Sequence, residues 1–547
     1  MSILKVDLIS GFTTDLVTID GRVAEGLSTT SSGNYSHSEG QFTTASGGAS
    51  HAEGGNTIAS GDGSHAEGNS TTAQGDFGSH SEGVGTIASG DSSHAEGAYT
   101  IAGGTISHAE GISTIASGPY SHAEGNTTTA SGQFSHAEGN STTASGTGSH
   151  SEGISTRASA TYSHAEGRQT TASGNNGSHA EGYQTTASGE ASHAEGRQTT
   201  SIGLFSHAEG YLTLSQSNFS HAEGQNTKGI GSASHAEGYF TSASGVYSHS
   251  EGRETTASGT FSHAQGFGSV ASGDGSHAEG GANFIGYSGG TASGPASHAE
   301  GISTLASGDA SHAEGIGTIA SGTRSHAEGE GTTASGNQSH AEGRATIANG
   351  AQSHAEGNET LTLGPSSHAE GYGTTASGDS SHTEGQYTTS VGIASHAEGY
   401  NTTASGIASH AEGYNTVSTG ESHSEGRETT ASGAQSHAEG YYTTASGISS
   451  HAQNNSNIAS GQSSHAGGAG STASGQFSFA HSYQSTVSGL RSAVLGGQNI
   501  TASSNDTVYM PKVELAETGQ GIIMKSPDGT RYNLTIANGG TISIALA

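Results

Sequence analysis

The sequence predicts an all-β fold, a parallel β-solenoid built from one short repeat, and three observations support this. The pair Ser-His occurs 31 times, and 26 of the 30 intervals between these histidines are 14 residues long. Each repeat holds two five-residue segments that end in Gly. Large apolar residues are scarce, since only 29% of the chain is hydrophobic and much of that is Ala. A fixed short period is typical of stacked repeats rather than of separate globular domains.

The consensus Ser-His-Ala-Glu-Gly-x-x-Thr-Thr-Ala-Ser-Gly-x-x defines 14 coil positions, counted from the Ser of Ser-His. Segments this short fit strands joined by tight turns, in which we expect Gly to supply positive φ. Alternation along each strand then places positions 1, 3, 8 and 10 inside and positions 2, 4, 9 and 11 outside. In the coil that starts at Ser135, the predicted inward set is Ser135, Ala137, Thr142 and Ala144. The predicted outward set is His136, Glu138, Thr143 and Ser145.

The pattern divides the chain into three parts. Residues 22–505 carry the repeat and predict a shaft of about 34 coils, whereas residues 1–21 are expected to be an N-terminal attachment segment. Residues 506–547 alternate apolar and polar residues between turn sequences, which predicts a small C-terminal β-meander that forms the tip. The interval from His277 to His298 is 21 residues long, and we expect its extra residues to protrude as a binding loop formed by Phe284, Ile285 and Tyr287.

Composition excludes several classes of function. The net charge of −34 argues against a nucleic-acid partner. The absence of Cys excludes disulfides and thiolate metal sites. The N-terminal sequence does not read as a signal peptide, and no run of about 18 apolar residues predicts membrane insertion. We therefore expect no cofactor other than, at most, a divalent metal.

The stretch Ala-Ser-Gly-x-x-Ser-x-Ala-x-Gly, as in residues 130–139, resembles the head repeats of YadA-like trimeric autotransporter adhesins. The resemblance implies a left-handed parallel β-roll that assembles as a homotrimeric rod. Similar arrays occur in bacteriophage tail-fibre and appendage proteins. In the family, positions 2 and 4 hold Val and Ile that face the other two protomers. In this chain they hold His and Glu.

We name the outward residues at positions 2 and 4 the His–Glu face. Of the 31 Ser-His coils, 28 carry Glu at position 4. The resemblance implies that this face is a polar trimer seam, and apolar residues in the same columns near the ends of the repeat favour partial burial. The predicted seam residues are Val23, His94, Glu96, His122, Glu124, His136, Glu138, Phe479 and Leu495.

Other interpretations of the His–Glu face stay open. It could be a solvated surface, or it could bind Zn²⁺ or Ni²⁺, because imidazole and carboxylate are ordinary ligands of both ions. Candidate ligands are His37, Glu39, His51, Glu53, His65 and Glu67. A Ser-His-Glu catalytic triad is disfavoured, because in an extended strand each Ser points away from the His that follows it. Since protonation removes the carboxylate partner of each His, we expect acid below about pH 5 to loosen the seam.

These observations predict a non-enzymatic, homotrimeric, tail-fibre-like rod that serves attachment or receptor display on a phage or virion. Residues 1–21 would join it to a larger particle, and a host-surface glycan or protein would be its receptor. The expected location is extracellular, on the virion surface. One alternative is the head of a bacterial cell-surface adhesin. Another is an ice- or mineral-binding β-solenoid that uses the outward Thr and Ser columns.

Overall fold

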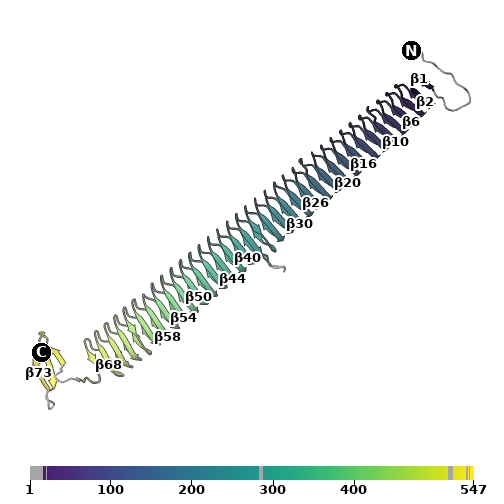
Figure 1. Ribbon diagram of the computed structural model, residues 1–547. Helices are drawn as coiled ribbons and strands as arrows, with labels where there is room; N and C mark the ends of the chain where they lie inside the picture. The colour runs from purple at the N-terminus through teal and green to yellow at the C-terminus, as the bar shows by residue number, and fades with distance from the viewer. Residues whose placement is uncertain are drawn as a thin grey trace. The chain divides into compact units, whose positions relative to one another are not determined.

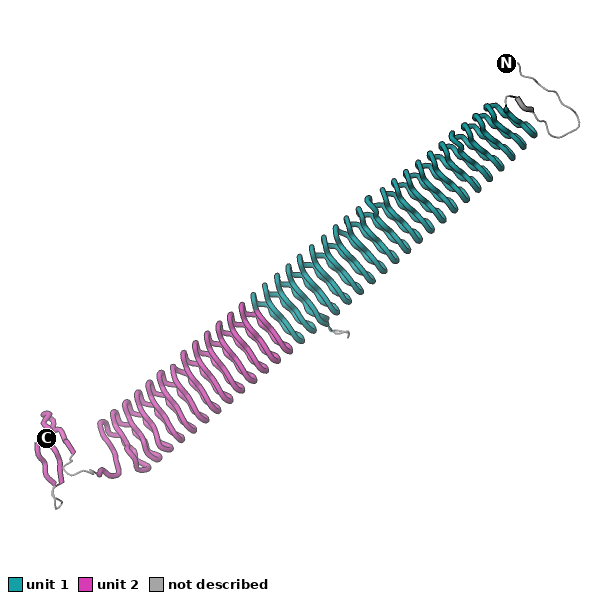
Figure 2. Tube along the Cα trace, viewed as in Figure 1, with its two compact units in different colours: residues 1–324 teal, residues 325–547 magenta. Residues whose placement is uncertain are grey.

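The computed structural model describes residues 17–19, 21–281, 288–514, 522–536, 540 and 542–546. The chain divides into two compact units, residues 1–324 and residues 325–547, which Figure 2 colours teal and magenta. Both units contain the 14-residue repeat, and the described residues contain strands and turns but no helix. Accordingly, no helix among these residues has the length and apolar character needed to cross a membrane.

Each regular coil contributes two strands, and each of them pairs in parallel with the equivalent strand of the next coil. Within each unit the coils stack in chain order (Figure 1). The longer strand covers positions 2–6, as in β18 (His136–Asn140), and the shorter covers positions 9–10, as in β19 (Thr143–Ala144). Strand β16 (His122–Asn126) pairs with β18 in parallel, with His122 opposite His136 and Ala123 opposite Ala137. The predicted parallel β-solenoid of about 34 turns is therefore confirmed for the described part of the chain.

The second unit repeats this arrangement and ends differently. Its last long strand, β68 (Ala493–Gln498), pairs with β70 (Val508–Tyr509). Three further strands, β71 (Ile522–Lys525), β72 (Arg531–Ile536) and β73 (Ile542–Leu546), form an antiparallel sheet in chain order. This sheet lies within the segment for which the sequence predicts a meander.

The interior is a set of columns of small side chains, as the alternation predicts. Ala137 and Ala144 are fully buried, and Ser135 and Thr142 are at most 1% exposed. The Ser135 hydroxyl donates to the Gly132 carbonyl at 2.7 Å. Where Ser replaces Ala at position 3, its hydroxyl also reaches the Thr at position 8 of the same coil. The five contacts of this kind are Ser38–Thr43, Ser81–Thr86, Ser151–Thr156, Ser250–Thr255 and Ser424–Thr429.

The corners differ in part from the prediction that Gly supplies the positive φ. Gly139 at position 5 has φ 105°, but the left-handed corner residues are positions 7 and 14, such as Ser141 (φ 60°) and Phe134 (φ 58°). Gly146 at position 12 is not left-handed. A Cβ there would lie 1.9 Å from the Ala160 carbonyl oxygen, so close approach of neighbouring coils favours Gly at that position.

The long insertion leaves the stacking register intact. It follows β38 (His277–Gly280), and the chain resumes at β39 (Thr291–Ala292). His277 pairs with His298 and Val270 pairs with Thr291, so the insertion shifts the register of neither sheet. The predicted binding-loop residues lie outside the described residues: Phe284, Ile285 and Tyr287.

The first coil is covered by a short strand. Strand β1 (Val17–Ile19) pairs antiparallel with β2 (Arg22–Leu27), with Val17 opposite Ala24. Its backbone satisfies an edge that would otherwise be open to pairing with another chain. Most of the predicted attachment segment, residues 1–21, lies outside the described residues.

Candidate functional site

The His–Glu face consists of two columns of outward side chains, His at position 2 and Glu at position 4. Because the long strands of the Ser-His coils start at the His of position 2 and pair in register, each His lies directly on the His of the next such coil. The rings of His94 and His108 are 4.8 Å apart between centroids, with an interplanar angle of 2°. The same spacing recurs along both units, and the T-shaped pair His451 and His465 is an exception. The columns therefore form a stack of parallel imidazoles beside a row of carboxylates.

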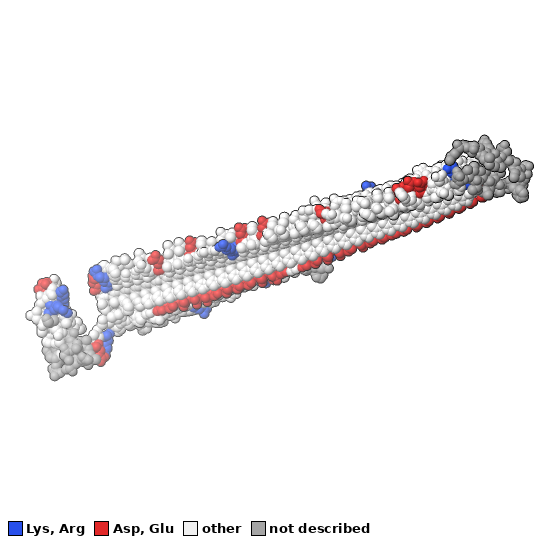
Figure 3. Space-filling view, turned by 45° about the horizontal axis from the view of Figure 1, so that its top comes forward, with Lys and Arg blue, Asp and Glu red and all other residues white. Residues whose placement is uncertain are grey.

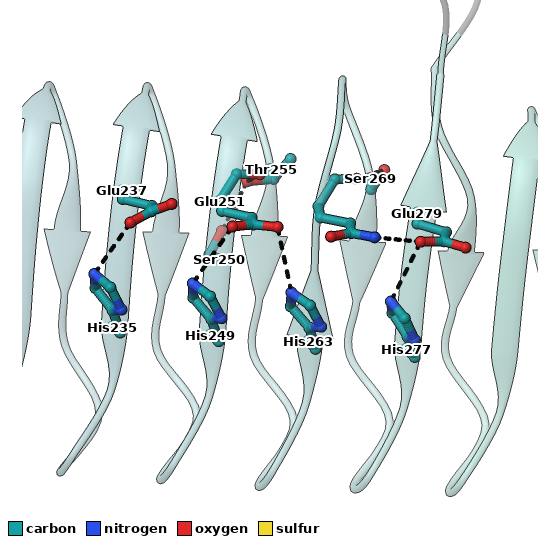
Figure 4. A network of polar contacts seen from close by, with 11 residues as sticks. His235, Glu237, His249, Ser250, Glu251, Thr255, His263, Ser269, His277 and Glu279 are labelled. Carbon is teal, nitrogen blue, oxygen red and sulfur yellow. Dashed lines mark hydrogen bonds and ion pairs between the residues drawn. The ribbon is translucent and has the colours of Figure 1, made fainter.

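In most coils the His lies beside the Glu of its own coil, as His235, His249 and His277 do in Figure 4. The coil of His263 carries Gln265 in place of Glu, and His263 lies beside Glu251 of the preceding coil. The separations between Nε2 and Oε2 within a coil run from 3.4 Å in His410–Glu412 to 3.9 Å in His249–Glu251. Glu138 spans two coils, because its oxygens lie 3.8 Å from Nε2 of His136 and 3.8 Å from Nε2 of His150. The carboxylates form the red row along the stacked coils in Figure 3.

The predicted seam residues all occupy these two columns. Val23 pairs with His37, and Phe479 pairs with His465, so both lie in the His column. Leu495 pairs with His481, which itself lies opposite Gly467 in the Glu column. The other members lie at coil positions 2 and 4: His94, Glu96, His122, Glu124, His136 and Glu138. Side chains on this face remain about one-third exposed in the single chain, as in His136 (37%) and Glu138 (32%).

Burial and stacking lower the pKa of many imidazoles in the column, which favours their neutral form. Burial lowers the pKa of His136, and the neighbouring His122 and His150 lower it further. Burial, followed by a neighbouring imidazole, has the same effect at His51, His80, His108, His164, His193 and His207. A protonated imidazole in this column would face another at 4.8 Å, which explains the direction of these shifts.

The carboxylates share protons along their column. Hydrogen bonds to Glu152 and Glu124 raise the pKa of Glu138 to about 7, and burial raises that of Glu166 to about 6. The pKa of Glu124 and that of Glu152 are lowered, chiefly by their hydrogen bonds to Glu138. The alternation of raised and lowered values means that these groups titrate as a row. It also revises the expected acid response, because the Glu138 carboxyl, with a pKa of about 7, is already partly protonated at neutral pH.

Gln interrupts the carboxylate row at two described coils. Gln265 donates through Nε2 to Glu279, the next carboxylate in the column. The long strand of that coil shortens to β36 (His263–Ala264), and the coil that carries Gln453 likewise shortens to β62 (His451–Ala452). A shallow groove lined by carboxylates and Gly follows the column across the first interruption, bordered by Glu237, Glu251, Gln265, Glu279 and Glu300.

In the coil that starts at Ser135, the Ser and His of the Ser-His-Glu triad considered above do not lie together. Ser135 lies inside the solenoid at 1% exposure, whereas the His136 side chain lies on the outer face at 37%. The Ser135 hydroxyl donates to Gly132, on the inner side. Nucleophile and base therefore lie on opposite sides of the strand in this coil.

The candidate metal ligands do lie together. His51, Glu53 and His65 have donor atoms within 4.8 Å of one another, and so do His65, Glu67 and His80. His37 Nε2 lies 3.8 Å from Glu39 Oε2. Five consecutive groups of this kind run to His122, and 18 more occur in the described part of the chain.

A second surface feature, at position 6, is the contact of Arg with aromatic side chains of the neighbouring coils, which sequence reasoning did not predict. The Arg197 guanidinium lies 5.7 Å from the Tyr183 ring centroid and 5.3 Å from that of Tyr211. Arg253 lies between Tyr239 and Phe267 in the same way, and Arg427 lies between Tyr414 and Tyr441. The signal was present as Arg and aromatic residues alternating at the repeat period.

Comparison with known families explains the repeat. A family model described as the YadA head domain repeat, in two copies, matches more than half of the chain. The matched segments are residues 52–76, 81–105, 109–135, 123–149, 180–206, 250–276, 299–325, 313–339, 327–353, 369–395, 397–420 and 424–450. The chain belongs to the YadA head-repeat family. Its coils are thus adhesin-like tandem repeats.

The family match includes both the interior and the outer face of the coils. The matched segments fall in both units and contain the buried Ala, Ser and Thr columns of the solenoid. The His–Glu face runs through the same segments, so the polar face is a property of the repeat and not of one site. No curated protein matches the chain.

Proposed function

We propose that this protein is a non-enzymatic attachment fibre, displayed outside the cell, in which three copies associate through the His–Glu face. The observation that carries the proposal is the recurrence of one outward face, with His at position 2 and Glu at position 4, over nearly all coils of a YadA head-repeat protein. A face repeated in every coil suits a long self-complementary contact. An active site would need only one such coil.

Three features support self-association through this face. Its side chains are only about one-third exposed, and burial and stacking lower the pKa of imidazoles such as that of His136. Apolar residues also enter both columns at Val23, Phe479 and Leu495. Trimers are also what membership of this family implies. We assign receptor contact to the ends of the long strands, where Arg and aromatic side chains at position 6 stack on one another.

The assembly is tested by charge reversal on matched faces. Sedimentation velocity of the full chain should give a mass of three chains. Replacing Glu110, Glu124 and Glu138 by Lys should yield single chains, because the added lysines would meet across the seam. The control replaces position 9 of the same three coils by Lys: Ile115, Thr129 and Thr143. The chain already carries Lys228 at that position, so the control should remain trimeric, and a monomeric wild type overturns the proposal.

The carrier is tested on intact material. Antibody against the full chain should label either purified virions, as for a tail fibre, or the surface of intact bacteria, as for an adhesin head. Label on the virion supports the tail-fibre form of the proposal, and label on the bacterium supports the adhesin form. Detection only inside cells overturns both.

A further inference from the structure

The imidazole nitrogens of the His–Glu face have an unused ligand atom. Nε2 is shielded from solvent and makes no hydrogen bond at most described His positions, including His51, His65 and His136. A shielded polar atom without a partner is unfavourable, and native proteins rarely leave such atoms in long series. Because an Nε2 atom without a hydrogen bond recurs along the column, we expect these atoms to bind a partner that the chain alone does not provide.

The nearest group to each nitrogen is a carboxylate at the wrong distance for a hydrogen bond. His51 Nε2 lies 3.7 Å from Glu53 Oε2, and His221 Nε2 lies 3.5 Å from Glu223 Oε2. Two ligands bound tetrahedrally to one Zn²⁺, with bonds of about 2.0–2.2 Å, lie about 3.4 Å apart. The observed separations are therefore close to those of two ligands on a common ion, and small side-chain rotations would suffice to bind one.

The next coil supplies a third donor. In each group of His, Glu and following His, the three donor atoms lie within 4.8 Å of one another. The carboxylate can also join the two imidazoles, as Glu138 does between His136 and His150 at 3.8 Å each. All these atoms come from one chain, so the ligand set does not depend on how many copies associate.

We propose that the His–Glu face binds a row of first-row transition-metal dications of the Zn²⁺ class, each held by His Nε2 and Glu carboxylate oxygens of adjacent coils. Each ion uses two coils, because consecutive groups share a His, as the first two share His65. Two carboxylates then balance each dication. With 28 Glu-bearing Ser-His coils, this charge balance limits occupancy to about 14 ions per chain, since closer dications repel one another strongly.

The ligand chemistry separates this row from simple attraction of counterions. A chain of net charge −34 collects any dication weakly. Imidazole ligands instead favour Zn²⁺, Co²⁺, Ni²⁺ and Cu²⁺ over Ca²⁺ and Mg²⁺, which prefer oxygen. Selectivity is therefore the property to be measured.

The experiment uses the full chain, dialysed against ZnCl₂ in the presence of excess CaCl₂, with bound metal counted by elemental analysis. We expect about one Zn²⁺ per two coils, retained against Ca²⁺. Replacing Zn²⁺ by Co²⁺ should give the visible absorption of nitrogen-bound Co²⁺. Displacement of the Zn²⁺ by Ca²⁺, or a Co²⁺ spectrum equal to that of the free aqueous ion, overturns the proposal.

A matched pair of variants locates the ions. The first replaces six consecutive column carboxylates by Gln and should bind about three fewer Zn²⁺ ions, in proportion to the ligands removed: Glu82, Glu96, Glu110, Glu124, Glu138 and Glu152. Gln265 and Gln453 already occupy this column, which indicates that the variant folds. The control removes the same charge at corners and should bind the wild-type number: Glu190, Glu254, Glu330, Glu359, Glu421 and Glu428. An equal loss in both variants overturns the proposal.

Discussion

At the scale of the residue, two constraints meet at the Gly of position 5. Gly139 has φ 105°, a region that side chains avoid, and a Cβ there would lie 2.3 Å from the carbonyl oxygen of Gly153 in the next coil. Position 7 is different. Residues at position 7 also have a left-handed backbone, but their side chains point toward solvent. Asn226 occupies that position with φ 55°. Conformation alone does not require Gly, whereas conformation together with close approach does.

This difference predicts the outcome of one pair of substitutions. Gly139→Ala should destabilise the solenoid by at least about 1–3 kcal/mol, the strain of an unfavourable φ, with the clash added to it. Gly317→Asn at position 7 should leave stability unchanged within about 0.5 kcal/mol, because nothing lies within 4 Å of a Cβ there and Asn tolerates this φ. Urea unfolding followed by circular dichroism measures both, and equal stability of the two variants would contradict the argument.

At the scale of the strand, much of the fold could be predicted because the same residue types recur at each coil position many times. Inward Ala137 and outward Glu138 follow from alternation, and the pairing of His122 with His136 follows from the period. The cover strand β1 and the shortening of β36 could not be predicted, because each occurs once or twice and depends on local backbone pairing. The contact of Arg197 with two rings depends on side-chain conformation, which the period leaves undetermined.

The metal and seam interpretations of the His–Glu face also depend on contacts that the repeat period does not determine. Columns of His and Glu could be read from the sequence, and the structure places them side by side. The direction in which their pKa values shift could not be read from the sequence. Burial and stacking at 4.8 Å determine it for the imidazoles, and carboxyl–carboxyl hydrogen bonds together with burial determine it for Glu138. Neither burial nor these contacts are encoded in residue type.

Insertions test the distinction between corner and strand. The interval from His65 to His80 is 15 residues long, yet the two residues pair in register, so a corner absorbs one extra residue. Inserting one Gly after Thr147, at a corner, should therefore shift the thermal midpoint little. Inserting one Gly after Ala137, within β18, should turn the Glu138 side chain inward and cost about 3–5 kcal/mol for the buried charge.

Thermal unfolding by circular dichroism and limited proteolysis report the two insertions. Cleavage near residue 138 in the strand variant alone is the expected result. Similar protection in both variants would show that long strands absorb an extra residue as readily as corners do.

At the scale of the whole molecule, the His–Glu face couples the fold to pH through two opposing sets of groups. Imidazoles with a lowered pKa, such as those of His136 and His207, favour the fold only while they are neutral. Carboxyls with a raised pKa, such as those of Glu138 and Glu166, favour it while they are protonated. As pH falls below 7, the first set therefore destabilises the fold and the second set stabilises it.

The imidazoles determine the sign of the change in stability. Lowered His pKa values recur in both units, whereas the raised Glu pKa values are partly offset by lowered ones at neighbours such as Glu124 and Glu152. The unfolded chain takes up protons at His as pH falls through about 6.5, and the folded chain does so only at lower pH. In the presence of a chelator, the thermal midpoint should thus fall by about 5 °C or more between pH 7 and pH 5. A second scan at 0.5 M NaCl is the control, since burial of the imidazoles resists salt whereas repulsion between exposed carboxylates is screened. A midpoint that stays level or rises on acidification would mean that the shared protons of the Glu column outweigh the stacked imidazoles.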